Sequence, residues 1–213
     1  MWNLIPIFAT PLLHTYIDPD ISAELKKVCD RMDWHIDADA GFDAGVSKDF
    51  YVLNSMDESV LKYFEDLFNE SIQNILGYEN PIQITTSWFT KTHPGGSCTE
   101  HTHTNSWYSA VLYFDEYDDN SSQLQLLQFV EGISSNSAQS NIYNSSDCRI
   151  LPQQNMMVMF PSALRHKVTR NNSDKIRYSL ALNMMPKGLC GTCLLYTSPS
   201  PRDATLSRMP SSA

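Results

Sequence analysis

Residues 92–115 read THPGGSCTEHTHTNSWYSAVLYFD, and the rest of the chain is best interpreted outward from this stretch. At its centre are two histidines, His101 and His103, one residue apart in a segment that reads as extended. In a β-strand, residues two apart project to the same side, so both imidazoles can reach one metal ion. Such a pair needs a third ligand, and His166 in the later phrase FPSALRHKV is the candidate.

If the extended conformation continues to Tyr113, the two sides of the segment differ in character. The odd-numbered side would carry His101, His103, Asn105, Trp107, Ser109, Val111 and Tyr113. The even-numbered side is mostly apolar and contains Tyr108, Ala110, Leu112 and Phe114. We therefore expect the odd side to face a site and the even side to face the core.

Helical patterns are confined to the N-terminal third of the chain. After a strand-like opening over residues 2–17, apolar residues recur at helical spacing over 18–32 and again over 57–76. The intervening residues 33–54 mix Asp, Gly and Ser and end in the strand-like FYVL. We expect two amphipathic helices, the second covering one face of a sheet.

Beyond Pro81 the pattern changes to extended segments separated by polar turns. These segments cover roughly residues 83–91, 107–114, 123–130, 155–160 and 176–184. Consecutive strands with no helix between them favour an antiparallel sandwich or barrel. The Ser- and Asn-rich loop 131–151 is long enough to cover a site or to lack structure.

The last extended segment, IRYSLALNM, has one apolar face and one polar face. Strand parity places Arg177 and Ser179 together on the inner side, followed by Ala181 and Asn183. An inward arginine requires an anion, because burying an unpaired charge is costly. A bound carboxylate would satisfy it. We expect Trp88 and Asn183 to be core residues rather than pocket residues.

Length and charge suggest one domain with a foreign tail. Residues 1–192 have the size of a single domain, whereas CLLYTSPSPRD at 193–203 reads like a translated sequencing adapter. We exclude 193–213 from the fold as an artefactual or disordered tail. The remainder carries 13 basic and 23 acidic residues, which argues against nucleic acid as a partner.

The same composition predicts a cytoplasmic protein. The start, MWNLIPIFATPLL, lacks the basic flank of a signal peptide, and no apolar run has transmembrane length, so no membrane partner is expected. The cysteines of the first 192 residues are scattered, as free thiols in a reducing compartment would be. They are Cys29, Cys98, Cys148 and Cys190.

Taken in order, these motifs resemble the 2-oxoglutarate- and Fe(II)-dependent oxygenase superfamily. The pattern is His101-x-His103, a distant His166, and Arg177-x-Ser179 eleven residues later. PGG before the ligands, VLYF after them and FPS ahead of His166 match as well, so the resemblance covers about residues 85–188. It implies a mostly β protein with a double-stranded β-helix, a jelly-roll barrel, and N-terminal helices packed on one sheet. The catalytic core would span about residues 83–188.

The resemblance also implies an activity and roles for individual residues. His101 and His166 would bind iron, and Arg177, Ser179 and Tyr113 would hold the distal carboxylate of 2-oxoglutarate. The chain would then be a dioxygenase, an oxidoreductase that hydroxylates a substrate and releases succinate and CO2. The sequence does not identify that substrate.

One position departs from the family, because His103 stands where the family has a carboxylate ligand. Either His103 completes a three-histidine site, or Asp115 or Glu100 supplies an acid, or His103 does not bind. A water or an anion could also fill the vacant position. Two other classes therefore remain open. One is a three-histidine cupin-type dioxygenase or isomerase without 2-oxoglutarate, and the other is a non-catalytic jelly-roll binding module.

Overall fold

The computed structural model describes residues 9–36, 41–128, 141 and 143–188. The tail at 193–213, most of the loop at 131–151 and Cys190 lie outside the described residues. Among the described residues, neither α-helix has the length and hydrophobicity that a transmembrane segment needs.

Two α-helices and ten strands make up the described part of the chain. The helices are α1 (Pro19–Cys29) and α2 (Glu58–Glu70), and a 3₁₀ turn (Val52–Ser55) and a π turn (Ser71–Ile75) flank α2. The strands are β1 (Leu13–Tyr16), β2 (Trp34–Ile36), β3 (Gly41–Ser47), β4 (Ile82–His101), β5 (Tyr108–Tyr113), β6 (Leu124–Leu127), β7 (Asp147–Ile150), β8 (Met156–Pro161), β9 (Arg165–Val168) and β10 (Arg177–Pro186).

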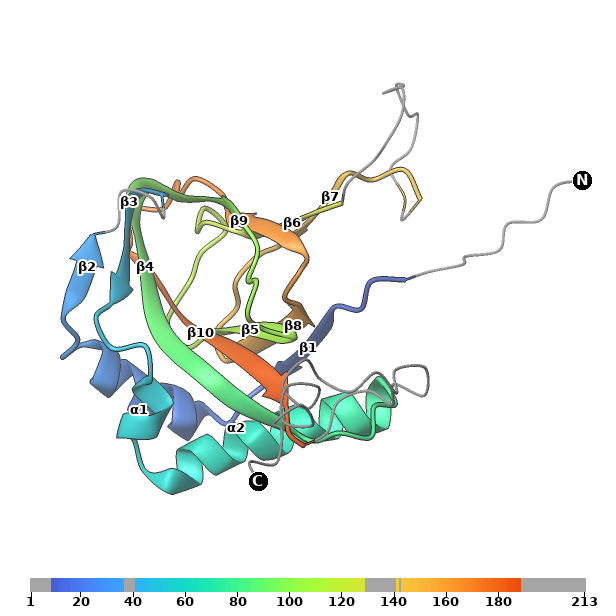
Figure 1. Ribbon diagram of the computed structural model, residues 1–213. Coiled ribbons are helices and arrows are strands. Elements are labelled where there is room, and N and C mark those ends of the chain that lie inside the picture. Colours follow the sequence, from blue (N-terminus) through green and yellow to red (C-terminus); the bar gives the residue numbers. More distant parts are fainter. Residues whose placement is uncertain (1–8, 37–40, 129–140, 142, 189–213) are drawn as a thin grey trace, which may run out of the picture.

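The strands form one curled antiparallel sheet, as the sequence predicts (Figure 1). Its order is β1-β8-β5-β10-β4-β9-β6-β7, with β3 pairing on β4 and β2 on β3. The long β4 pairs with β10 over its first half and with β3 and β9 farther on, so it bends from one part of the sheet into the other. This bend brings the end of β4 over the inner side of the sheet.

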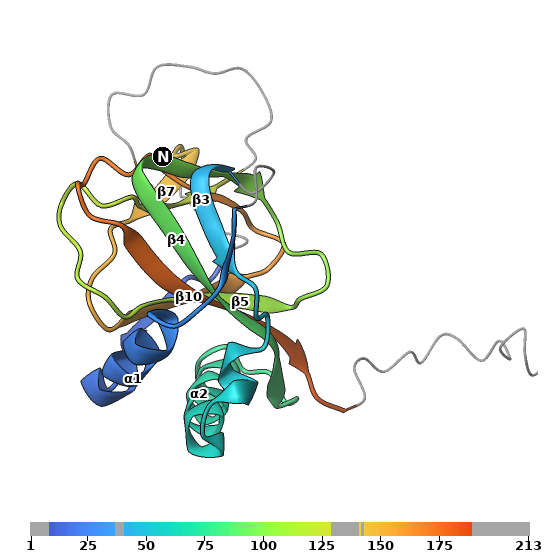
Figure 2. The same cartoon turned by 90° about the vertical axis from the view of Figure 1, so that its left-hand side faces the viewer.

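The helices contribute to the larger of two hydrophobic clusters. Each begins at an aspartate whose side chain accepts a backbone N–H, Asp18 for α1 and Asp57 for α2. Both helices lie close together near one end of the sheet in Figure 2. Their apolar stripes share one cluster with outer-face strand residues: Leu25, Cys29, Phe64 and Phe68 from the helices, and Phe89, Leu112 and Leu180 from the strands. Opposite them, the second cluster includes Leu124, Val158 and Phe160.

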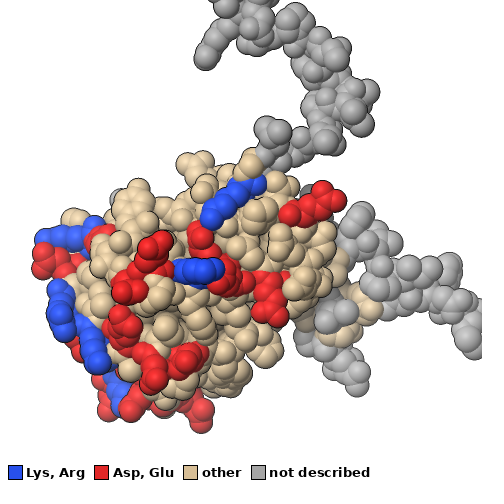
Figure 3. Space-filling view, turned by 90° about the horizontal axis from the view of Figure 1, so that it is seen from below, with Lys and Arg blue, Asp and Glu red and all other residues tan. Residues whose placement is uncertain are grey.

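Charged side chains cover the outside of this helical end. On the face drawn in Figure 3, Lys and Arg are dispersed among Asp and Glu. Within the helices, Lys26 pairs with Asp30 at 3.1 Å and Lys62 with Asp66 at 2.7 Å, each one turn apart. Such exposed pairs contribute little to stability, and they mark this face as solvated.

Several strand boundaries differ from the sequence prediction. FYVL at 50–53 is not a strand, since Tyr51 makes only an isolated bridge before the 3₁₀ turn. The short strands β2, β3, β7 and β9 have no clear alternation in the sequence and were not expected. β3 contains two glycines, and it is defined by its pairing with β4 rather than by its own pattern.

The two glycines of the PGG motif serve different backbone needs. Gly95 has φ +83°, a conformation that favours glycine. Gly96 lies against β3 so closely that a Cβ atom would be 2.5 Å from the Asp43 carbonyl oxygen and 2.9 Å from that of Phe42. The motif thus permits the close approach of β3 to β4.

We expect Gly96→Ala to destabilise the protein by about 2–3 kcal/mol, because backbone atoms on both sides would have to move. The melting temperature should fall by several degrees. The neighbouring, partly exposed Ser97 provides the control, and Ser97→Ala should change the melting temperature little. An unchanged melting temperature for Gly96→Ala would contradict the close packing of β3 on β4.

Candidate metal centre

Three histidines that are far apart in the sequence meet on the inner side of the sheet. One potential ligand atom from each of His101, His103 and His166 lies within 4.8 Å of the others. His101 ends β4 and is the register partner of His166 in β9. His103 lies in the turn after β4, where its backbone N–H donates to the Ser162 carbonyl at 3.0 Å.

The extended conformation does not continue from His101 to Tyr113 as the sequence analysis supposed. β4 ends at His101, a turn follows, and β5 starts at Tyr108. The turn, rather than strand parity, brings His103 to His101, with ring centroids 5.3 Å apart. Within β5, parity does hold, since Tyr108, Ala110 and Leu112 pack in one hydrophobic cluster and Val111 and Tyr113 in the other.

Backbone carbonyls set the tautomers of two of the imidazoles. Nδ1 of His101 lies 2.9 Å from the Thr99 carbonyl oxygen, and Nδ1 of His166 lies 2.8 Å from that of Leu164. Because a carbonyl oxygen only accepts, each Nδ1 carries the proton. Each Nε2 therefore has a free lone pair, as a metal ligand requires.

Burial keeps two of the imidazoles neutral. It lowers the pKa of His166 from 6.5 to about 4, against an opposing effect of the Leu164 carbonyl and with help from the neighbouring histidines. Burial also lowers the pKa of His103 to about 4, assisted by the proximity of His101. Both rings are thus neutral at physiological pH, the state in which imidazole binds metals.

These shifts predict an acid-sensitive metal-free protein. As the pH falls from 6.5 to 4, His103 and His166 take up protons in the unfolded chain but not in the folded one. The free energy of unfolding therefore decreases across this window and is unaffected by these groups above it. For buried His166 the loss is on the order of 3 kcal/mol at the acid end, and for half-buried His103 it is smaller because solvent screens the charge.

The measurement is the melting temperature of chelator-treated protein between pH 7 and pH 4.5. The double variant His103→Asn/His166→Asn should lose less stability than the parent over the same range. Equal losses in both proteins would show that other groups cause the acid sensitivity.

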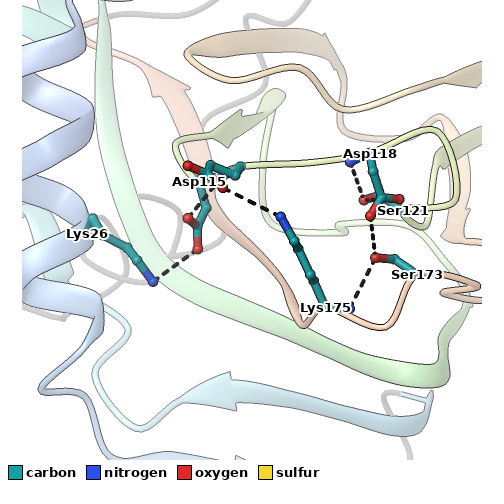
Figure 4. A network of polar contacts seen from close by, with 7 residues as sticks. Lys26, Asp115, Asp118, Ser121, Ser173 and Lys175 are labelled. Atoms are coloured by element: carbon teal, nitrogen blue, oxygen red, sulfur yellow. Dashed lines mark hydrogen bonds and ion pairs between the residues drawn. The ribbon is translucent and has the colours of Figure 1, made fainter.

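Neither acidic residue proposed as a substitute ligand joins the histidines. Glu100 pairs with Arg165 at 2.7 Å, and Asp115 points to Lys26 at 3.0 Å (Figure 4). Among the residues that the structure describes, the cluster contains three imidazoles and no carboxylate. Of the options left open by the sequence, the geometry favours the three-histidine set.

In the same cavity as the histidines, β10 places a buried arginine. Arg177 is 3% exposed, and no ion pair joins it to a described Asp or Glu. Its Nη1 donates to the Ser179 hydroxyl at 3.2 Å, and its guanidinium carbon lies 5.0 Å from the centre of the Tyr113 ring. Nε of Arg177 and the hydroxyl of Tyr113 have no hydrogen-bond partner among the described residues. These unpaired buried atoms are what an anion-binding pocket needs.

Tyr113 stays protonated in this setting. Its burial raises the pKa of the hydroxyl, and the positive charge of Arg177 opposes that rise. A neutral phenol can donate a hydrogen bond to an anion beside the guanidinium.

Polar contacts fix the loops that lead to Tyr113 and Arg177 (Figure 4). After β5, Asp115 binds Lys26 of α1, and Asp118 accepts a hydrogen bond from the Ser173 hydroxyl at 2.6 Å. Asn171, which is buried, extends the network by donating to the carbonyls of Thr92 and of residue 175. The ends of β5, β4 and β10 are therefore held together around the pocket.

The histidines and the arginine open into one cavity of 330 Å³. Ser179 lines it too, whereas Tyr113 reaches it through its contact with Arg177. Trp88 also lines the cavity, so the expectation that it is a core residue was wrong. Its inward orientation follows from its register partner, Ala181, which parity places on the same side as Arg177.

One family model matches part of this chain. Residues 86–183 match the family model described as "Putative 2OG-Fe(II) oxygenase". No curated protein has a sequence that matches this chain.

Among solved structures, the chain is similar to several enzymes at low sequence identity. An oxidoreductase of the 2OG-Fe(II) oxygenase family from Burkholderia pseudomallei is 14% identical, with 82% of this chain and 83% of that chain covered and a TM-score of 0.57. A prolyl-4-hydroxylase from Pseudomonas putida is 15% identical, with coverage of 84% and 94% and a TM-score of 0.57. HygX from Streptomyces hygroscopicus, solved with nickel, 2-oxoglutarate and hygromycin B, is 11% identical, with coverage of 84% for both chains and a TM-score of 0.58. At these identities the similarity establishes the fold.

Proposed function

We propose that this chain, whose residues 86–183 match the family model described as "Putative 2OG-Fe(II) oxygenase", is a dioxygenase that hydroxylates its substrate. The observation that carries the proposal is that three imidazoles and a buried arginine, which has no counter-ion among the described residues, line the same cavity. The first suits a metal ion, and the second suits the carboxylate of a cosubstrate.

In this proposal His101, His103 and His166 hold Fe(II). Nε2 is the donor atom of His101 and His166, because their Nδ1 atoms donate to backbone carbonyls. Three protein ligands leave positions for a bidentate cosubstrate and for oxygen. Replacing the usual carboxylate by His103 makes the centre more positive by one unit, which favours anionic ligands in the open positions.

Arg177, Ser179 and Tyr113 would hold 2-oxoglutarate. A guanidinium binds a carboxylate through two parallel hydrogen bonds, which would engage the unpaired Nε of Arg177. The Ser179 hydroxyl lies beside Nη1 of Arg177, and the Tyr113 hydroxyl is unpaired, so both can donate to the same carboxylate. An arginine buried at this depth is stabilised only when such an anion is present.

When bound, iron and 2-oxoglutarate supply an oxidative decarboxylation that yields succinate and CO2 and places one oxygen atom on a substrate carbon. The protein would orient the cosubstrate through Arg177, and burial keeps His103 and His166 neutral. Its apolar walls exclude water from the reacting centre.

A three-histidine set without a carboxylate is also typical of cupin-type dioxygenases that do not use 2-oxoglutarate. That second function would leave buried Arg177 without a partner. The cost of an unpaired buried guanidinium therefore favours the 2-oxoglutarate-dependent reaction.

The activity test uses iron-loaded protein with 2-oxoglutarate labelled at C1. We expect labelled CO2 and unlabelled succinate to form in equal amounts and only in air. Neither product should form once the metal is chelated. Absence of succinate with every substrate tried, together with metal-dependent oxygen uptake, would favour the cupin-type reaction instead.

A serine behind the metal centre should position His103. Ser162 is fully buried, and its hydroxyl lies 2.8 Å from the hydroxyls of both Ser106 and Ser109, while its carbonyl accepts the His103 N–H. We expect Ser162→Ala to lower iron affinity only several-fold, because the carbonyl that holds His103 remains and only its hydroxyl support is lost. Direct partners of a ligand ring are worth about 10- to 100-fold.

The matched control is Ser22→Ala. It removes a similarly buried hydroxyl from α1, one with no hydrogen-bond partner in the part of the chain that the structure describes. Iron affinity of this variant should equal that of the parent, as measured by competition with a chromophoric chelator. Equal iron affinities for the Ser162→Ala and Ser22→Ala variants would show that Ser162 does not position His103.

The proposal extends to the whole domain. The shared hydrophobic cluster of helices and strands supports a single domain over residues 1–192, with a double-stranded β-helix core at about 83–188 and the helices on one of its sheets. Among the described residues, Cys29, Cys98 and Cys148 form no disulfide, which is compatible with the reducing cytoplasm.

A further inference from the structure

Three rings form a continuous wall from the surface to the metal centre, in the order Phe50, Trp88, His103. The centroids of Phe50 and Trp88 are 6.0 Å apart, and those of Trp88 and His103 are 5.9 Å apart. All three residues line the cavity, and Phe50 is 41% exposed. We call Phe50 and Trp88 the aromatic wall. A molecule that enters the cavity past Phe50 can contact this wall as far as the histidines.

The cavity has no charge available for a substrate. The charged residues among its described lining are Lys91 and Arg177, and this lining includes no Asp or Glu. The ammonium of Lys91 lies 4.5 Å from the centre of the Trp34 ring, whose other neighbour is Tyr178. Strand parity puts that group on the opposite face of β4 from Trp88. Arg177 is committed to the cosubstrate, so a charged substrate group would be desolvated without compensation.

Three of the hydroxyls that line the cavity, those of Thr90, Ser109 and Ser179, already have hydrogen-bond partners. Thr90 and Ser179 share a hydrogen bond of 2.7 Å. Ser109 bonds to Ser162 and to Asn183, each at 2.8 Å. Small apolar side chains, Ala44 and Ala181, lie among these residues and leave space in front of the wall. A strongly polar substrate would therefore lose its hydration and gain few partners.

We propose that the group oxidised by this protein sits on, or next to, an uncharged, mostly hydrocarbon ring that packs on the aromatic wall. Phe50 and Trp88 are then specificity-determining residues. Aromatic faces bind flat or ring-shaped apolar groups by burial and by edge-to-face contact, at low cost in side-chain entropy. This inference rests on the proposed function, because it takes the Arg177 side of the cavity to be filled by 2-oxoglutarate.

The test measures binding of three probes to the protein loaded with Fe(II) and 2-oxoglutarate under anaerobic conditions. Indole is the uncharged ring, indole-3-carboxylate its anionic counterpart, and myo-inositol a polar ring. By calorimetry, indole should bind at one site per chain, at least tenfold more tightly than either of the other two. Indole that fails to bind, or an anionic or polar probe that binds as well, would overturn the proposal.

Matched variants locate the site. Trp88→Ala should weaken indole binding at least tenfold, and Trp88→Phe should restore most of it. The control is Trp34→Ala. Trp34 is also a half-buried tryptophan but lies on the other face of the sheet, so indole binding should be unchanged. The exposed Phe50 offers a variant, Phe50→Ala, with little risk to folding, and indole binding should weaken there also. Indole affinity equal in the parent and the Trp88→Ala variant would refute the wall as the binding surface.

Binding of 2-oxoglutarate, measured first on each protein, separates this inference from the proposed function. If the parent does not bind 2-oxoglutarate, the proposed function fails. If 2-oxoglutarate binds normally and the affinity for indole is the same with and without the Trp88 side chain, only the substrate inference fails.

Discussion

Iron should no longer bind at one equivalent per chain once His166 is replaced by alanine. His166 is the buried member of the histidine cluster, and its Nε2 is free to bind because Nδ1 donates to Leu164. Losing a group that merely orients a ligand costs 10- to 100-fold in affinity, so losing a ligand itself should cost more than a hundredfold. The measurement is iron content after gel filtration, together with affinity from chelator competition.

One control variant and one second test variant accompany His166→Ala. The exposed His35 lies outside the cluster, and His35→Ala should keep full iron binding. His103→Ala removes a half-buried ligand from a turn, with less risk to folding, and should lower iron affinity as His166→Ala does. A folded His166→Ala protein that retains stoichiometric iron would contradict the three-histidine centre.

Replacing Arg177 by alanine should weaken 2-oxoglutarate binding roughly thirty- to several-thousand-fold, corresponding to about 2–5 kcal/mol for truncating one partner of a buried charge pair. Iron affinity without cosubstrate should barely change, because Arg177 contacts Ser179 and Tyr113 rather than the histidines. This separation of two affinities is specific to the oxygenase proposal. In a cupin-type enzyme, 2-oxoglutarate would bind neither protein.

Arg177→Met, which keeps much of the side-chain volume, guards against collapse of the pocket and should show the same loss. Arg165→Ala is the control, since Arg165 is an arginine near the site that pairs with Glu100 at the surface. Equal 2-oxoglutarate affinity in the parent and both Arg177 variants would show that the guanidinium does not hold the cosubstrate.

Much of the site could be predicted because it depends on local periodicity. In β10 the alternation of Arg177, Ser179 and Ala181 with apolar residues predicts the inner face, and the structure confirms burial of the first two. The meeting of His166 with His101 was inferred from the order of the motifs. β9, the strand that carries His166, was not foreseen, because its four residues are too few to show a period.

Other features depend on contacts between distant segments and are not encoded in any one of them. β3 contains glycines and no alternating pattern, and its pairing with β4 is what makes it a strand. That pairing explains why β4 continues through the glycines of the PGG motif to His101. Trp88 was assigned to the core because an inward tryptophan normally packs, and only the assembled sheet shows a cavity in front of it.

The most direct test of the central claim is an anaerobic titration of the metal-free protein with Fe(II) and 2-oxoglutarate. The signal is the visible charge-transfer absorption that arises when 2-oxoglutarate binds iron through its keto acid. We expect a band that requires both components and saturates at one Fe(II) and one 2-oxoglutarate per chain. Its midpoint should shift to much higher 2-oxoglutarate in Arg177→Ala. Stoichiometric iron binding without any such band, at saturating 2-oxoglutarate, would contradict the account.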